Sequence, residues 1–287
     1  MYGMNYLVAK GLMPDKIAPS ALALLRVGGT ALFFMVFNFF IKEKIEKRDW
    51  PRLIICGVCG LGINPVCSMN GLSLTSPVDA SIIMTATPLL TLVFSYYVLK
   101  EEITRQKMLG VFLGGLGAVL LIYFGGKDRD SGASLLGNGM ISGSAISFAL
   151  YLVFVKPLMQ KYQVFTVISW VFFFGFIFAL PIGISQLVGT NFGSFENKNW
   201  VALGYTVLFP TLLANLLNVF ALQYVKPATS GSYIYVQPVI AMVLVASMGY
   251  FLIDSYQGAI TPAKLGCSLL VFAGVYLISA KKLFVKK

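Results

Sequence analysis

Long apolar stretches separated by short polar segments set the pattern of this chain. A helix that crosses about 30 Å of hydrocarbon needs about 20 such residues. Nine stretches reach that length, at residues 20–41, 53–74, 77–99, 106–124, 135–156, 165–188, 200–224, 227–253 and 262–280. A tenth, at residues 1–13, is about a dozen residues too short. The pattern therefore predicts an all-α integral membrane protein with ten transmembrane helices, the first of them truncated.

The chain also contains an internal repeat. Residues 77–88 and 227–238 each begin and end with a proline and carry a small residue, Ser81 or Gly231, four positions after the first proline. Flanking segments match at the same offset of 150 residues, and a seven-residue insertion later shifts the offset to 157. Such self-similarity indicates two related structural units. We place them at residues 1–125 and 134–283.

Each of these units is expected to contain five helices. Because five is an odd number, the second unit enters the membrane from the opposite side, and the two repeats are inverted. Inverted repeats with a binding site between them, near the middle of the bilayer, are the common plan of secondary transporters. In that plan one half of the protein moves against the other.

Composition agrees with a membrane protein, since 57% of the residues are apolar and 11% are charged. The net charge of +11 indicates loops that face anionic lipid rather than a nucleic-acid partner, because no basic run is interleaved with aromatic residues. Fifteen Lys and Arg residues fall in loops on the side of the carboxyl terminus, and five fall on the other side. The positive-inside rule therefore predicts a multi-pass protein of the plasma membrane, here a bacterial inner membrane, with both termini in the cytoplasm.

The chain lacks the residues that enzymes, ATP-driven pumps and metal sites usually need. The chain has no histidine, the commonest general base. It has no paired carboxylates within a predicted helix and no Gly-x-x-x-x-Gly-Lys-Ser/Thr phosphate loop. The cysteines all lie in apolar stretches, so buried thiols are expected rather than a zinc or redox site: Cys56, Cys59, Cys67 and Cys267. The sequence therefore predicts neither an enzyme nor an ATP-driven pump, and no metal or cofactor.

Polar residues inside the predicted helices are candidate binding residues, because an amide that faces lipid has no hydrogen-bond partner. Hydrogen bonding between helices is the alternative role for each of them. Pro88 and Pro238, near mid-membrane, are expected to kink their helices. Each kink would serve either as a hinge or binding site, or only for packing. Tyr233 and Tyr235 lie about 200° apart on a helix, so they cannot both face one cavity. The predicted cavity residues are Asn5, Lys10, Asn64, Thr85, Pro88, Tyr151, Asn215, Asn218, Tyr235, Gln237 and Pro238.

Other conspicuous residues have structural interpretations. Asp79 follows Ser76 and Pro77 as an ordinary helix start, which we favour over a proton carrier. Lys10 and Arg26 could bind a substrate carboxylate, or could instead extend to the nearest membrane surface. A stripe of small residues predicts close helix packing at Gly110, Gly114 and Gly117. Lipid contact is expected for Phe172, Phe173, Phe174, Phe176 and Phe178.

Several segments together resemble the EamA family of the drug/metabolite transporter superfamily. They are residues 2–10, Arg26, residues 70–77, Pro88, and residues 100–104 followed by Gly110, Gly114 and Gly117. Their order and spacing carry the resemblance, which extends over essentially the whole chain. One departure is that Phe251 and Leu252 stand where the first repeat has Glu101 and Glu102, so this acidic pair is not duplicated.

The resemblance implies two inverted five-helix repeats around a central cavity lined mainly by helices 1, 3, 4, 6, 8 and 9. It implies export of amino acids or other small metabolites by alternating access. Uptake, exchange of nucleotide-linked substrates, and a non-transporting sensor or structural role are the alternatives. The expected partners are a small-molecule substrate and the lipid bilayer, with no nucleic acid, and the protein is expected to be a monomer or a homodimer.

Overall fold

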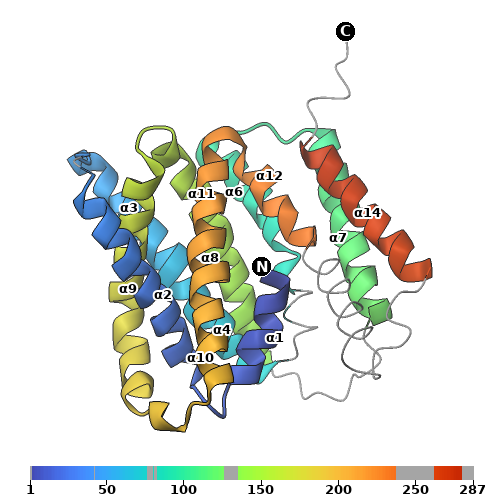
Figure 1. The fold of residues 1–287 in the computed structure, drawn as a ribbon. Coiled ribbons are helices and arrows are strands. Elements are labelled where there is room, and N and C mark those ends of the chain that lie inside the picture. Colours follow the sequence, from blue (N-terminus) through green and yellow to red (C-terminus); the bar gives the residue numbers. More distant parts are fainter. Residues whose placement is uncertain are drawn as a thin grey trace.

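The fold is all-helical throughout the part of the chain that can be described. A computed structural model describes residues 2–41, 43–75, 80, 83–125, 135–236 and 262–279, and no strand occurs among them. Most helices run up and down a bundle, with short connections at its two ends (Figure 1). Within the described ranges, five helical stretches are long and apolar enough to cross a membrane: Pro19–Phe39, Lys47–Leu74, Leu135–Met159, Val164–Val188 and Asn197–Tyr224. The number of ten helices and their inversion remain predictions.

Helix boundaries follow the apolar stretches closely. The first half contains α1 (Tyr2–Leu12), α2 (Pro19–Phe39), α3 (Trp50–Gly57), α4 (Asn64–Leu74), α6 (Thr87–Leu99) and α7 (Arg105–Gly125). The second half contains α8 (Leu135–Met159), α9 (Val164–Val188), α10 (Asn197–Val207), α11 (Ala214–Tyr224), α12 (Pro227–Ser232) and α14 (Pro262–Ser279). The largest differences between predicted and observed helix boundaries are in the stretches predicted at residues 77–99 and 227–253.

Two of the long helical stretches are interrupted by a π-helical turn. Val58–Ile63 joins α3 to α4, and Leu208–Leu213 joins α10 to α11. Both turns have six residues, and their starts differ by 208 − 58 = 150, the offset of the sequence repeat. A π turn shifts the hydrogen-bonding pattern by one residue and occurs frequently at functional sites. The two halves of the chain therefore share one local distortion at matching positions.

The stretch predicted as a single helix at residues 77–99 is broken. Thr85 and Ala86 form a turn, and α6 begins at Thr87 with Pro88 in its first turn. Proline is well suited to that position, since a first-turn N–H has no acceptor within the helix. The prediction of a continuous helix kinked at Pro88 is therefore wrong. In the second half, α12 passes into a 3-10 turn at Tyr233–Tyr235, and Pro238 lies beyond the described residues.

Glycine notches bring α9 close to its neighbours. A methyl group at Gly57 would lie 2.6 Å from the Phe174 side chain, and one at Gly28 would lie 2.9 Å from the Phe176 ring. Phe172 is fully buried in the same core. The expectation of lipid contact is therefore wrong for Phe172. Phe174 and Phe176 are half-buried and pack against glycines of neighbouring helices.

The predicted small-residue stripe on α7 is confirmed as a packing surface. α7 and α14 lie side by side at one edge of the molecule (Figure 1). A methyl group at Gly110 would lie 2.8 Å from the carbonyl oxygen of Gly274, and one at Gly117 would lie 2.9 Å from that of Cys267. Backbone meets backbone along this seam, so side chains larger than hydrogen do not fit.

A charged cluster ties the connection between α2 and α3 to the connection between α8 and α9. Lys161 Nζ and the Tyr162 hydroxyl both donate to Asp49 Oδ2, at 2.6 Å and 2.7 Å. Lys161 also lies 2.6 Å from a Glu46 carboxylate oxygen. The hydrogen bonds to Asp49 and Glu46 hold the pKa of Lys161 above its ordinary value. This cluster links the first half of the chain to the second at one end of the bundle.

Asp49→Asn is expected to lower the free energy of unfolding by about 1–3 kcal/mol, because a largely buried acceptor of two hydrogen bonds loses its charge. Thermal unfolding in detergent measures the effect. Glu196→Gln is the matched control, since it removes a carboxylate from an exposed ion pair with Lys198 at 2.8 Å. Exposed pairs contribute less than about 1 kcal/mol. Equal melting temperatures for the two variants would contradict the prediction.

Candidate functional site

A pocket of about 450 Å³ lies between α2, α4, α8, α11 and α12. This volume is within the range of small-molecule sites. The wall is largely apolar, and its polar members are Asn5, Arg26, Asn64, Ser68, Ser144, Thr211, Asn215, Asn218, Ser230 and Tyr233. Arg26 is the one charged side chain among the described lining residues. The described part of the chain contains no group of three side chains suited to hold a metal ion.

Matching positions of the sequence repeat line this pocket together. Five pairs of lining residues are each 150 positions apart: Gly60 and Pro210, Leu61 and Thr211, Pro65 and Asn215, Ser68 and Asn218, and Met84 and Ile234. The first two pairs belong to the π turns, so both turns form part of the wall. Both halves of the chain therefore contribute equivalent elements to one site.

Arg26 is directed into the pocket from α2. It lies seven residues into the helix, about 10 Å from the start at 1.5 Å per residue. Its Nε donates to Thr211 Oγ1 at 2.9 Å, and its Nη1 donates to Met69 Sδ at 3.4 Å. The residue is 8% exposed. The alternative in which Arg26 extends to the membrane surface is therefore wrong.

The π turn of the second half orients Thr211 toward Arg26. Pro210 has no N–H to donate, and the Thr211 hydroxyl donates to the carbonyl oxygen of Thr206 at 2.7 Å while it accepts from Arg26. Asn215 Nδ2 donates to the Thr211 carbonyl oxygen at 2.8 Å. These bonds satisfy backbone carbonyls of the distorted helix and at the same time position the guanidinium group.

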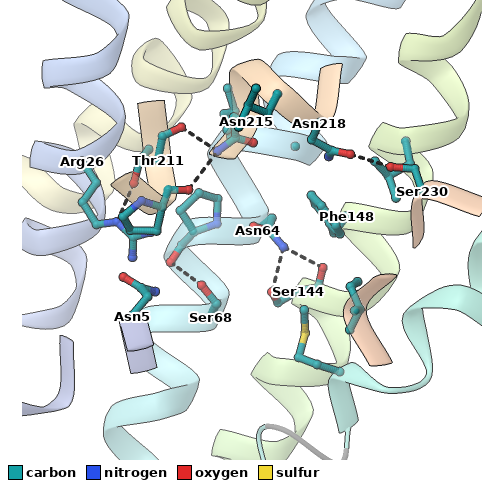
Figure 2. A pocket seen from close by; sticks show the side chains of 18 of the residues that line it. Asn5, Arg26, Asn64, Ser68, Ser144, Phe148, Thr211, Asn215, Asn218 and Ser230 are labelled. Atoms are coloured by element: carbon teal, nitrogen blue, oxygen red, sulfur yellow. Dashed lines mark hydrogen bonds between the residues drawn. The ribbon is translucent and has the colours of Figure 1, made fainter. Parts of the chain in front are cut away.

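Asn5 of α1 brings an unsatisfied acceptor to the same end of the pocket. Figure 2 shows its side chain beside that of Arg26. The residue is 5% exposed, and its Oδ1 is buried without a hydrogen-bond partner among the described residues. A buried acceptor left unpaired costs about 1–3 kcal/mol. A bound molecule with a hydrogen-bond donor would recover this free energy.

The remaining amides connect helices around the pocket (Figure 2). Asn64 Nδ2 of α4 donates to Ser144 of α8, at 2.9 Å to Oγ and 3.1 Å to the carbonyl oxygen. Ser230 of α12 donates to Asn218 Oδ1 of α11 at 2.6 Å. These pairs hold four helices at the edge of the cavity, which is the interhelical role considered for each amide from the sequence.

Four of the predicted cavity residues come together in this pocket: Asn5, Asn64, Asn215 and Asn218. Lys10 belongs to α1, but its side chain is outside the described part of the structure. Gln237 and Pro238 also lie outside the described residues.

Four other predicted residues lie elsewhere, each for a packing reason. Tyr151 is buried against Gly60, where a methyl group would lie 2.5 Å from its ring. The Tyr235 hydroxyl donates to the Val111 carbonyl oxygen at 3.3 Å, away from the pocket. Its neighbour Tyr233 takes the place in the pocket wall. Thr85 and Pro88 are buried near the start of α6 and do not line the pocket.

Several pocket residues were not selected from the sequence. They include Ser68 and Thr211, and the repeat contained a signal for Ser68 alone, because its counterpart Asn218 is a predicted cavity residue whereas Leu61 is apolar. Ser68 is the counterpart of Asn218, and Thr211 the counterpart of Leu61, at the offset of 150. Ser144 had no such signal, because hydroxyl groups are common on packed membrane helices.

Comparison with known proteins identifies the family. The sequence profile of the EamA-like transporter family matches residues 1–123 and again residues 135–280. The uncharacterized transporter YetK of Bacillus subtilis is 26% identical over 246 residues, which cover 84% of this chain and 74% of YetK. An uncharacterized transporter of Archaeoglobus fulgidus is 26% identical over 270 residues, covering 93% of this chain and 90% of the relative.

A solved crystal structure supports the same fold. It aligns with a TM-score of 0.73 and 17% identity, over 96% of this chain and 94% of the other. The two profile matches together cover most of the chain. The chain therefore belongs to the EamA-like transporter family and is a membrane transporter rather than an enzyme.

Proposed function

We propose that this transporter exports amino acids or similar small metabolites across the plasma membrane by alternating access between two inverted repeats. The observation that carries the proposal is the pocket wall, in which five pairs of residues occupy matching positions of the repeat. A site formed equally by two halves can open to either side when one half moves against the other. The surplus of basic loops supports an orientation with both termini in the cytoplasm.

The chemistry of the pocket favours a carboxylate that carries a hydrogen-bond donor close by. Arg26 offers a charge-assisted hydrogen bond to an anionic group. Asn5 Oδ1 offers a buried acceptor to an ammonium group or another donor. The apolar remainder of the wall suits a hydrocarbon side chain. A nucleotide-linked substrate carries at least two phosphate charges, and the described wall holds one cation, so the amino acid is the better match.

Transport in proteoliposomes tests this proposal. Liposomes that contain the purified protein are loaded with radiolabelled L-leucine, and efflux is followed with and without an imposed gradient. We expect saturable efflux faster than from protein-free liposomes, and competition by other apolar amino acids but not by uridine diphosphate glucose. If none of the proteinogenic amino acids moves or competes, the proposed substrate class is wrong.

A further inference from the structure

The acidic pair that the second repeat lacks has a specific place in the structure. α6 ends at Leu99, and the next residue, Lys100, adopts φ 56° and is the one non-glycine residue with positive φ in the described ranges. A left-handed residue costs about 1 kcal/mol or more unless it is glycine. The Glu101 N–H then donates back to the Ser95 carbonyl oxygen at 3.3 Å. This turn fixes the backbone from which the Glu101 side chain extends.

Glu101 joins the two repeats at the end of the bundle where α6 stops and α12 starts. Its Oε2 lies 3.5 Å from Lys107 Nζ, near the start of α7, and 3.9 Å from Lys226 Nζ, immediately before α12. The Glu101 and Lys107 side chains are 12% and 13% exposed. The Lys226 side chain is 57% exposed. A single partly buried carboxylate therefore links the first half of the chain to the residue that precedes a pocket helix of the second half.

Helices also pack closely near this end of the pocket. A methyl group at Gly231 of α12 would lie 3.2 Å from Thr91 Oγ1 of α6. Lys156 of α8 donates to the carbonyl oxygens of Leu222 and Gln223 at the end of α11. The lining residues Ala221 of α11 and Ser230 of α12 are next in sequence to Leu222 and Gly231, which make these contacts. If the pocket opens at this end by a separation of α6 from α12, Glu101 moves away from Lys226.

We propose that Glu101 is a one-sided ionic latch, which holds the pocket closed toward the carboxyl-terminal side and releases when the pocket opens there. This inference rests on the proposed alternating-access function. At the matching position of the second repeat the sequence has Phe251, so the repeat does not duplicate this carboxylate. The latch therefore biases the protein toward the state that is open on the other side of the membrane.

The test measures access to the pocket from each side. Ala221→Cys, a pocket position on α11, serves as reporter in a variant without the four native cysteines. An impermeant methanethiosulfonate reagent is added to inside-out or to right-side-out membrane vesicles. Glu101→Gln is expected to raise the labelling rate from the predicted cytoplasmic side about two- to fivefold, the range for a partly exposed ion pair. The rate from the opposite side is expected to fall.

Further variants separate a latch from a general loss of stability. Lys226→Gln should reproduce the effect of Glu101→Gln, and the double variant should add nothing further, because one interaction is removed in each case. Glu196→Gln removes a carboxylate from the exposed ion pair with Lys198, away from the pocket. It should leave the labelling rates from both sides unchanged. Faster labelling from both sides, or no change in either rate, would overturn the latch while leaving transport intact. Labelling from one side only in every variant would overturn the proposed function, and the latch with it.

Discussion

Arg26→Gln is expected to raise the KM for L-leucine about 10- to 100-fold, with a smaller effect on the maximal rate. The variant removes a charge-assisted hydrogen bond to the substrate carboxylate, which contributes about 1.5–3 kcal/mol. Each 1.4 kcal/mol corresponds to a factor of ten in affinity. Initial rates in proteoliposomes over a range of leucine concentrations measure the change.

Two comparisons make the Arg26 result specific. Arg26→Lys keeps the positive charge but loses the bond from Nε to Thr211, so an intermediate KM is expected. Leucinol, which lacks the carboxylate, should be a weak inhibitor of leucine transport. Its inhibition constant should be the same for the native protein and for Arg26→Gln. If Arg26→Gln melts at the native temperature and transports leucine with an unchanged KM, Arg26 does not bind the carboxylate.

Gly274→Leu is expected to destabilise the protein by about 3 kcal/mol, because overpacking a well-filled contact costs roughly that much. A methyl group at Gly274 would lie 2.7 Å from the Gly110 carbonyl oxygen and closer still to the backbone of Gly114. Those atoms belong to the backbone of α7 and cannot move without the whole helix. The fraction of protein that remains folded and monodisperse after heating in detergent measures the loss.

Gly266→Leu is the matched control on the same helix. Gly266 is exposed, and a methyl group there would meet no atom within 4 Å. Leucine has a higher helix propensity than glycine by somewhat less than about 1 kcal/mol. This variant should therefore melt at or above the native temperature. If the two leucine variants lose the same stability, the seam between α7 and α14 is not a close backbone contact.

Much of the secondary structure was predictable from the sequence because membrane helices obey a local rule. Every backbone polar group within the bilayer must be satisfied, and a helix satisfies its own. Apolar length alone therefore located segments such as α2 and α9. Prolines were harder to interpret, since Pro88 starts a helix whereas the neighbourhood of Pro210 contains a π turn. Whether a proline starts a helix or lies within a distorted one depends on whether a neighbouring side chain can donate a hydrogen bond to the carbonyl that the proline leaves unpaired. The Thr211 hydroxyl does so for the Thr206 carbonyl oxygen.

The site was only partly predictable. Buried amides at Asn5, Asn64, Asn215 and Asn218 stood out because an amide is costly in lipid. The two tyrosines of the 3-10 turn could not be ranked from the sequence, because both are amphipathic and each has an apolar ring. The space beside Gly114 accommodates Tyr235 and leaves Tyr233 in the pocket wall.

The sequence by itself determined the membrane class, the repeat and the family, since these depend on apolar length, spacing and order of residues along the chain. Only the tertiary structure decided which side chains meet. A helix in a membrane is apolar on the side that faces lipid and on the side that faces another helix, so periodicity carries little information about direction. The side of each helix that faces another helix is set by the close contacts at glycines, by the π turns and by the hydrogen bond from Arg26 to Thr211.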